Sequence, residues 1–395
     1  MNRRKIAVIT GSRADYGLLR GIIQGIRDDR DLILQLVVTG MHLSAESGRT
    51  VREIEKDGFP IAARVDMKLV SDTSFAVASS MGTGMKGFAS AYARLRPDMI
   101  VVLGDRFEIH AAVSAAVPFR IPVAHIHGGE STEGVFDEQF RHSITKISHV
   151  HFPSTHFYKQ RIVQMGEDPK YVFCFGAPGI DAILRLKKLL DDRETLCRKL
   201  KIPAGRKIGA ITYHPITLEA DKGVSMLTEL FQALVQTKGI YWVVNSSSGD
   251  IGGRMITERI KSFVKRNPGR AVFYKNLGQK TYFSLLKHAS VMVGNSSSGI
   301  IESPSFHLPA VNVGDRQRGR VRAANVIDIR KCQKSAIAKA IQKAVSPKFK
   351  ASLKRLKNPY GNGDASRKIV AKLKEIPLNE QLLKKVFHEF KNRNY

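Results

Sequence analysis

The stretch KIAVITGSRADYG, residues 5–17, decides the fold class of this chain. It joins a short apolar run to a turn of small residues and then to the start of a helical segment. Further short apolar runs follow at residues 32–39, 99–103, 122–126 and 150–152, with longer amphipathic stretches between them. This alternation predicts a parallel β-sheet wrapped by helices.

A second series of the same kind follows a charged helical segment at residues 183–201. Its apolar runs lie at residues 207–212, 239–244, 271–274, 291–293 and 310–313. We therefore predict an α/β protein with two doubly wound, Rossmann-like domains that enclose an interdomain cleft. In open sheets of this type, ligands bind beyond the carboxyl ends of the strands, so the loops there are expected to carry the site.

The expected N-terminal domain covers residues 1–178 and the C-terminal domain residues 179–365. Residues 331–395 hold 17 Lys and Arg against four Asp and Glu, and the spacing of Leu382, Leu383, Val386 and Phe390 is helical. We expect a terminal helix within residues 366–395 that packs back on the first domain and presents a solvated basic face.

The composition excludes some classes of protein but leaves several classes of anionic partner open. A chain of 395 residues with 43% apolar residues has room for two or three globular domains at ~150 residues each, and disorder is excluded. The net charge of +29 would attract nucleic acid, anionic lipid or phosphorylated metabolites. No apolar run approaches the ~18 residues of a membrane span. Cys174, Cys197 and Cys332 show neither disulfide nor zinc spacing, which fits a reducing cytoplasm.

The turn after the first strand, residues 11–17, allows backbone amides and Arg13 to meet an anionic group at a helix start. A simple tight turn between strand and helix is the alternative. The turn has no GxGxxG pattern, and no acidic residue closes the second strand, so a nicotinamide cofactor is disfavoured.

Ionisable residues follow two neighbouring strands. Asp105 comes directly after the run at 99–103, where it would be either catalytic or a helix cap. The next strand ends in HIHGGE, which contains His127 and Glu130. A predicted helix then brings Asp137, Glu138, Arg141 and His142, and we expect His142 to hold the loop through a hydrogen bond. Crowded carboxylates and imidazoles can acquire separated pKa values, which suits a site that removes and supplies protons.

The second half carries the features of a phosphate site. Residues 295–299, NSSSG, offer three hydroxyls and exposed amides at a helix start, and a serine cap is the less favoured alternative because no cap needs three serines. The loops at 213–215, 245–249 and 314–320 end other strands on the same sheet edge. Arg316, with Arg320 nearby, would attract a diphosphate through its guanidinium fork. No acidic pair is placed for Mg²⁺, so we expect neither a metal nor a cofactor.

These motifs together resemble the hydrolysing UDP-N-acetylglucosamine 2-epimerases of sialic acid and related nonulosonic acid biosynthesis. The matching segments are TGSRADYG (10–17), GDRFE (104–108), HIHGGE (125–130), DEQFRHSITK (137–146), YHPIT (213–217), GNSSSGIIE (294–302) and GDRQRGR (314–320). The resemblance implies a fold like the GT-B glycosyltransferases, a UDP-sugar in the cleft, and a cytoplasmic homo-oligomer, dimer or tetramer. It implies conversion of UDP-N-acetylglucosamine and water to N-acetylmannosamine and UDP.

The resemblance also implies roles for individual positions. Asp105 and Asp137 match carboxylates that act at the sugar, and His42 matches a histidine near it. His127 stands where some relatives have Glu, so the general base is His127 or Glu130. The residues expected to bind the UDP moiety are Arg13, His214, Asn295, Ser296, Ser297 and Arg316 at the diphosphate and Glu302 at the ribose.

The implied reaction removes the proton from C2 of the sugar while UDP leaves C1, and water then adds to the glycal with inversion at C2. The charge of the departing diphosphate must be stabilised by the basic and serine groups. Two alternatives remain open: a glycosyltransferase that passes the sugar to an acceptor, and a nucleic-acid-binding protein, for which the chain shows no motif. The sugar itself is N-acetylglucosamine or a 2,4-diacetamido-trideoxyhexose.

Overall fold

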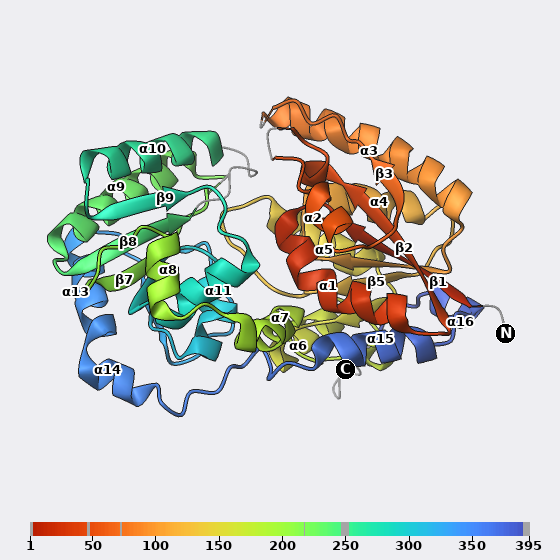
Figure 1. Cartoon of the computed structure of the whole chain (residues 1–395). Helices are drawn as coiled ribbons and strands as arrows, with labels where there is room; N and C mark the ends of the chain where they lie inside the picture. Colours follow the sequence, from red (N-terminus) through yellow and green to blue (C-terminus); the bar gives the residue numbers. More distant parts are fainter. Residues whose placement is uncertain (1–2, 46–47, 72, 217, 246–252, 390–395) are drawn as a thin grey trace. The chain divides into compact units, whose positions relative to one another are not determined.

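The computed structural model describes residues 3–389, except for residues 46–47, 72, 217 and 246–252. The chain divides into two compact units (Figure 1). Unit 1 takes residues 1–130, 137–182 and 360–395, and unit 2 takes residues 131–136 and 183–359. The hexapeptide 131–136 was expected in the first domain, but its contacts group it with unit 2. Most of the loop expected at 245–249 lies outside the described residues.

Unit 1 is built on a six-stranded parallel sheet of order β3-β2-β1-β4-β5-β6. Its strands are β1 (Arg4–Thr10), β2 (Leu32–Thr39), β3 (Ile61–Val65), β4 (Met99–Leu103), β5 (Val123–Ile126) and β6 (Val150–Phe152). The helices are α1 (Arg13–Asp28), α2 (Val51–Lys56), α3 (Ser74–Leu95), α4 (Phe107–Ala116), α5 (Asp137–Ile147) and α6 (His156–Gln164). Helix α7 (Pro178–Leu186) begins in unit 1 and ends in unit 2. All of β4 is buried, because helices cover both faces of a parallel sheet.

Unit 2 repeats this plan with the order β12-β11-β10-β7-β8-β9. Its strands are β7 (Lys207–Thr212), β8 (Ile240–Asn245), β9 (Ala271–Tyr274), β10 (Val291–Gly294), β11 (Ala310–Val313) and β12 (Val326–Ile329). The helices are α8 (Arg193–Lys199), α9 (Ala220–Gln236), α10 (Gly253–Arg266), α11 (Gln279–His288), α12 (Ser298–Ile301), α13 (Lys334–Val345) and α14 (Pro347–Ser352). The predicted α/β class with two doubly wound sheets is confirmed.

Both sheets have the strand order whose direction reverses at one point, between β1 and β4 in unit 1 and between β7 and β10 in unit 2. Ligands of doubly wound folds bind in the crevice beyond the carboxyl ends of the strands at this reversal. The segments that directly follow these four strands contain Arg13, the first residue of α1, and Asp105, His214 and Asn295 in loops. The topology therefore places the predicted residues at the positions where such folds bind ligands.

The C-terminal part of the chain returns to unit 1, where α15 (Ala365–Glu375) lies beside α1 (Figure 1). Ile369 and Leu373 of α15 belong to the same apolar core as Ile22 and Ile26 of α1. This packing explains why α15 is ordered although one face of it is strongly basic.

The helical spacing that begins at Leu382 and Leu383 does not continue as a helix to Val386. After α15 the chain passes Pro377 and forms only α16 (Glu380–Leu383). Proline fixes φ and lacks an amide hydrogen, which ends the helical hydrogen bonding. Lys385 then adopts a φ of 30° and donates to the carbonyl of Ser148 at 2.6 Å, and Val386 is 80% exposed instead of packed. Phe390, the last residue of the expected pattern, lies outside the described residues.

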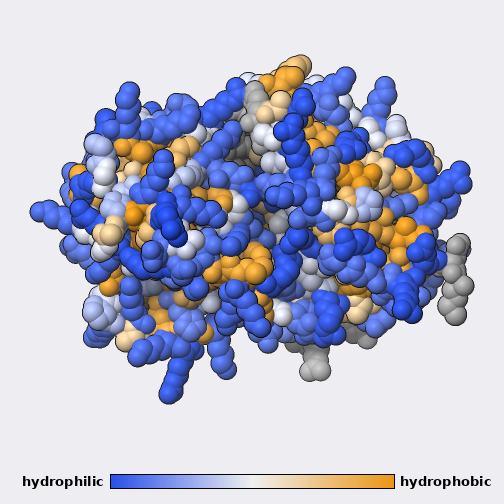
Figure 2. All heavy atoms as spheres, viewed as in Figure 1, coloured by the Kyte–Doolittle hydropathy of each residue, from blue (hydrophilic) through white to orange (hydrophobic). Residues whose placement is uncertain are grey.

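No helix among the described residues is both long and apolar enough to cross a membrane. The face seen in Figure 2 is mainly hydrophilic, with apolar side chains in separate patches. Much of the charge comes from residues 330–357, where ten Lys and Arg occur without an acidic residue and all ten are exposed. Charged side chains are rarely buried, so this segment is a solvated basic surface.

Candidate functional site

Two loops meet at the strand-order reversal of unit 1. A Cβ atom on Gly11 would lie 2.5 Å from Cγ of Glu108, so only glycine permits this approach. Glu108 is completely buried, and its carboxylate accepts a hydrogen bond from Nε of Arg106 at 2.6 Å. The loop after β1 is thereby fixed against the loop after β4.

Asp15, in the first turn of α1, lies in the same buried region. Its amide donates to the Ser12 hydroxyl at 3.3 Å, which caps the helix. Burial raises the pKa of Asp15 to about 6, while the neighbouring Arg106 lowers it and Glu108 raises it further. A carboxyl group held against its ionisation preference is a common feature of ligand sites.

Replacing Asp15 with asparagine is expected to stabilise the fold at neutral pH. Between pH 3.8 and about 6 the unfolded chain loses the Asp15 proton before the folded chain does, so wild-type stability falls as pH rises. The Asp15→Asn variant does not lose stability in this way. Its free energy of unfolding should exceed that of the wild type by at most roughly 3 kcal/mol at pH 7.5, and this source should add nothing at pH 3.5. Urea unfolding at the two pH values measures the difference. An equal effect of the substitution at both pH values would contradict it.

Arg13 begins α1, as expected for a residue that meets an anion at a helix start. Its Nε donates to Oε2 of Glu53 on α2 at 2.7 Å, and the Arg13 side chain is 25% exposed. The sequence did not indicate Glu53 as a partner. Half-exposed pairs of this kind are weak, so a diphosphate could take the place of Glu53.

His42, predicted near the sugar, is completely buried in the structure. Its Nε2 lies 3.0 Å from Oγ1 of Thr10 and its Nδ1 lies 2.9 Å from Oγ1 of Thr50. Burial lowers the pKa of His42 to about 4, so the ring is neutral. Because both ring nitrogens bond to threonines, we interpret His42 as a residue that positions the loops after β1 and β2. The place near the sugar that the resemblance implies for His42 stays a prediction.

Asp105 follows β4, and its side chain is 25% exposed. It does not cap α4, whose N-cap position is taken by Arg106 without a side-chain bond. Its Oδ2 instead accepts a hydrogen bond from Nη2 of Arg141, which is 1% exposed. Arg141 also donates to Oε2 of Glu138 at 2.5 Å and to the carbonyl of Glu130 at 3.3 Å. Arg141 thus links the loop after β4, the loop after β5 and helix α5.

His127 and Glu130 form a buried pair after β5. The Nδ1 atom of His127 donates to Oε1 of Glu130 at 2.5 Å, and the Ser154 hydroxyl donates to the same oxygen at 2.7 Å. His127 has a φ of 66°, a left-handed conformation that is strained for a residue with a side chain. Its Nε2 is buried and has no hydrogen-bond partner among the described residues. The pair therefore presents an imidazole nitrogen that is oriented by a carboxylate and able to accept a proton.

The remaining acidic candidate of this unit, Asp137, is the partly buried first residue of α5. His142 bonds through Nε2 to Oε1 of Glu138 at 3.2 Å, so this bond lies within α5 and does not reach the loop that His142 was expected to hold. No three His, Cys, Asp or Glu side chains gather as metal ligands in the part of the chain that the structure describes.

In unit 2, Asn295 joins three strand ends. Its Oδ1 accepts from the amide of His214 at 2.7 Å, and its Nδ2 donates to the carbonyl of His214 at 2.8 Å. Nη1 of Arg316 donates to the Asn295 carbonyl at 3.1 Å, and Nε2 of Gln317 donates to it at 2.9 Å. Asn295 is fully buried and both of its side-chain amide atoms are hydrogen-bonded, so it positions the loops that carry His214 and Arg316. Its expected contact with UDP stays a prediction.

The serine turn follows directly. Gly294 has a φ of 141°, and a Cβ there would lie 2.0 Å from the carbonyl oxygen of Thr212, so β10 can approach β7 only with glycine. Oγ of Ser296 accepts from the amide of Ser298 at 3.3 Å, and Tyr282 donates to the Ser298 hydroxyl at 2.7 Å. Tyr282 is a contact that the sequence did not indicate.

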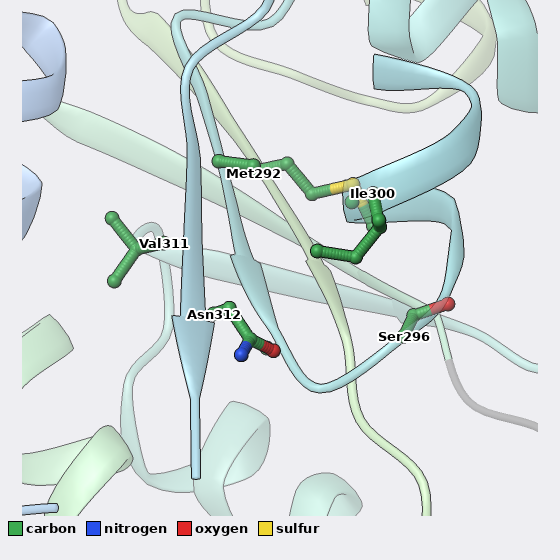
Figure 3. Close-up of a pocket in the computed structure, with 8 residues that line it drawn as sticks. Met292, Ser296, Ile300, Val311 and Asn312 are labelled. Atoms are coloured by element: carbon green, nitrogen blue, oxygen red, sulfur yellow. The ribbon is translucent and has the colours of Figure 1, made fainter. Parts of the chain in front are cut away.

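A small cavity of about 10 Å³ lies next to this turn, with the labelled residues around it in Figure 3. That volume is on the scale of one water molecule and is too small for a phosphate group. Its lining, mostly apolar, comes from β10, β11 and the start of α12: Met292, Gly294, Ser296, Gly299, Ile300, Ala310, Val311 and Asn312. The cavity is thus a packing defect beneath the turn.

The other expected UDP ligands of unit 2 are His214, Ser297, Glu302 and Arg316. All four are partly exposed, in contrast to the buried Asn295 and Ser296. They lie after β7, β10 and β11, at neighbouring strand ends of one sheet edge. The unit therefore offers a guanidinium, an imidazole and a serine turn to an anionic ligand.

This fold defines a class: proteins with two Rossmann-like units of the GT-B kind. The particular family is shown by sequence, because residues 24–374 match the model of the UDP-N-acetylglucosamine 2-epimerase family. The chain belongs to that family. The glycosyltransferase alternative is correspondingly less supported.

Two relatives share 38% of their residues with this chain. One is the GDP/UDP-N,N'-diacetylbacillosamine 2-epimerase (hydrolyzing) of Campylobacter jejuni, matched over 89% of this chain and 90% of that protein. The other is the UDP-N,N'-diacetylbacillosamine 2-epimerase (hydrolyzing) of Legionella pneumophila, matched over 97% and 98%. Among solved structures, the UDP-GlcNAc 2-epimerase of Methanocaldococcus jannaschii in complex with UDP-GlcNAc and UDP superposes with a TM-score of 0.80 at 19% identity, over 93% of this chain and 99% of that one. The structural likeness supports the fold.

Proposed function

We propose that this protein is a hydrolysing 2-epimerase of a UDP-linked 2-acetamido sugar, with UDP-N,N'-diacetylbacillosamine as the preferred substrate. Unit 1 handles the protons and unit 2 binds the UDP moiety. The observation that carries the proposal is the His127–Glu130 pair, whose Nε2 is buried, oriented and able to accept a proton. Family membership supplies the type of reaction.

In the first step, the base removes the hydrogen from C2 of the sugar as the C1–O bond to UDP breaks. Nε2 of His127 takes the proton, and Glu130 stabilises the imidazolium through Nδ1. The product is a glycal with a C1–C2 double bond. Water then adds its oxygen to C1, and an acid delivers a proton to the opposite face of C2. Asp105 and Asp137 are the carboxyl groups available for these proton transfers, each typically contributing ~10²–10⁴-fold.

In the same step, the diphosphate leaves with a growing negative charge. Arg13, Arg316, His214 and the serine turn are the groups that would bind it, and binding that strengthens as charge develops accelerates the reaction. Glu302 would bind the ribose hydroxyls. No metal is needed in this scheme, because guanidinium groups and backbone amides neutralise the diphosphate.

The identity of the sugar is supported by the two relatives at 38% identity, both named for N,N'-diacetylbacillosamine. That sugar carries an acetamido group at C4 and a methyl group at C5, where N-acetylglucosamine carries a hydroxyl and a hydroxymethyl group. The test is to incubate the purified protein with each UDP-sugar and no acceptor, and to follow release of UDP. We expect release from both, faster from the diacetamido sugar. Release that requires an added acceptor would instead indicate a glycosyltransferase.

Replacing Arg316 with alanine is expected to weaken UDP binding by on the order of 10- to 100-fold, since a charge-assisted contact to phosphate is lost. Isothermal titration calorimetry with UDP measures this. Arg318→Ala serves as the control, because Arg318 is 58% exposed and pairs only at 3.6 Å with Glu133. Equal UDP affinity in Arg316→Ala and wild type would remove Arg316 from the binding site.

A further inference from the structure

The hexapeptide 131–136 connects two candidate proton-handling residues of unit 1. In sequence it directly follows Glu130 and directly precedes Asp137, both of them candidate proton-handling residues. Its contacts nevertheless group it with unit 2, whereas Glu130 and Asp137 belong to unit 1. Whatever holds the hexapeptide therefore restrains the backbone at both of these residues.

The holding contacts come from the loop after β11. Nη2 of Arg320 donates to the hydroxyl of Thr132 at 3.1 Å, and Thr132 is only 3% exposed. Gly319 has a φ of 79°, and a Cβ there would lie 3.2 Å from Cβ of Ser131, so the two segments are in close contact. The same loop carries Arg316, the candidate diphosphate ligand.

A second contact comes from the loop after β7, which carries His214. The amide of Leu218 donates to the carbonyl of Gly134 at 3.0 Å, and Ile216 packs against Gly134. Val135 is 2% exposed. Both loops that hold the hexapeptide are thus loops expected to bind UDP.

The loop after β11 is itself braced. Arg322 donates to the carbonyl of Arg320 at 2.7 Å and to the carbonyl of Gln317 at 2.8 Å, while its Nε bonds to Asp328 of β12. Because these hydrogen bonds connect its backbone at Gln317 and Arg320, a change at Arg316 can be transmitted to Arg320.

We propose that the hexapeptide 131–136 is a tether through which UDP binding to unit 2 positions the proton-handling residues at its ends, with Arg320 and Thr132 as positioning residues. The proposal rests on the proposed function. The nucleotide binds far from the reacting carbon, and part of its binding energy is used to orient Glu130 and Asp137. Glu130 in turn orients His127.

The decisive variant is Thr132→Val, which keeps the shape and leaves the charge of Arg320 intact. We expect kcat to fall on the order of 10- to 100-fold, because misplacement by about 1 Å has effects of that size. UDP affinity should stay within about twofold of wild type, and Thr132→Ser, which restores the hydroxyl, should restore kcat. Glu133→Gln is the matched control within the hexapeptide: its pair with Arg318 is exposed, so kcat should not change.

Arg320→Gln separates positioning from direct phosphate binding. If Arg320 positions the hexapeptide, Arg320→Gln and Thr132→Val remove the same interaction. The kcat of the double variant should then be no lower than that of the slower single variant. A loss of UDP affinity in Arg320→Gln that matches its loss of kcat would show that Arg320 binds the diphosphate, and would overturn the proposal. Unchanged kcat in Thr132→Val would also overturn it.

Hydrogen exchange tests the tether without turnover. In the wild type, bound UDP should slow amide exchange in residues 127–137, and this protection should be lost in Thr132→Val. Absence of UDP binding would refute the proposed function. UDP binding with no change in exchange at residues 127–137 would refute the tether alone.

Discussion

Asp105→Asn is expected to lower kcat by ~10²–10⁴-fold, the usual contribution of a positioned acid or base. Asparagine has the size of aspartate but cannot exchange a proton with the sugar. Asp105 follows the buried strand β4, and Arg141 binds its carboxylate from a site that is 1% exposed, so the carboxylate is held in one position. The side chain keeps 25% of its surface exposed, which leaves it accessible to a substrate.

The measurement is UDP release under saturating substrate, combined with calorimetry of UDP binding. UDP affinity should be unchanged, because Asp105 belongs to unit 1 and the proposed diphosphate ligands of unit 2 are intact. Asp221→Asn, an exposed carboxylate in the first turn of α9, is the control and should retain full kcat. Full turnover in Asp105→Asn would exclude this residue from the mechanism.

His127→Gln should cause a loss of similar size, ~10²–10⁴-fold in kcat. Glutamine removes the nitrogen that accepts the C2 proton. Glu130→Gln should also be slow, for another reason: its amide could donate to Nδ1 of His127, which would move the imidazole hydrogen to Nε2 and block the base. The two variants together decide which residue is the base.

If His127 is the base, His127→Gln removes most of the rate. If Glu130 is the base and His127 only orients it, His127→Gln keeps a substantial rate while Glu130→Gln loses most of it. Measurement of kcat for the wild type and both variants distinguishes the two cases. Full activity in His127→Gln would contradict the assignment.

The sequence predicts the buried part of the fold well, and for a physical reason. Central strands such as β4 are apolar on both faces, so they stand out as short continuous runs. The two strands that were missed, β3 and β12, each lie at one edge of their sheet and contain the exposed residues Arg64 and Asp328. These residues interrupt the apolar run that marks a buried strand, whereas the edge strand β6 is buried throughout and is visible in the sequence.

The positions of the candidate residues also follow from the sequence, because the strand-end rule depends only on topology. Their hydrogen-bond partners do not. The side chain of Asn295 forms hydrogen bonds with the backbone of His214, 81 positions earlier in the chain. The serine motif alone does not predict these bonds. In the same way, only the structure shows that both nitrogens of His42 are bonded to threonines.

The hexapeptide 131–136 is the clearest case. Its place in the sequence, between a strand and a helix of unit 1, assigns it to the first domain, whereas its contacts with Arg320 and Leu218 assign it to unit 2. The local sequence does not distinguish a loop that packs on its own unit from a loop that packs on the other unit.

Isotope incorporation in heavy water tests the central claim most directly. Purified protein is incubated in D₂O with UDP-N,N'-diacetylbacillosamine or UDP-N-acetylglucosamine, and the freed sugar is analysed by NMR. We expect one deuterium on C2, with the configuration at that carbon inverted, for each UDP formed. UDP formed alongside a sugar that retains its original hydrogen and configuration would show simple hydrolysis and would contradict the account.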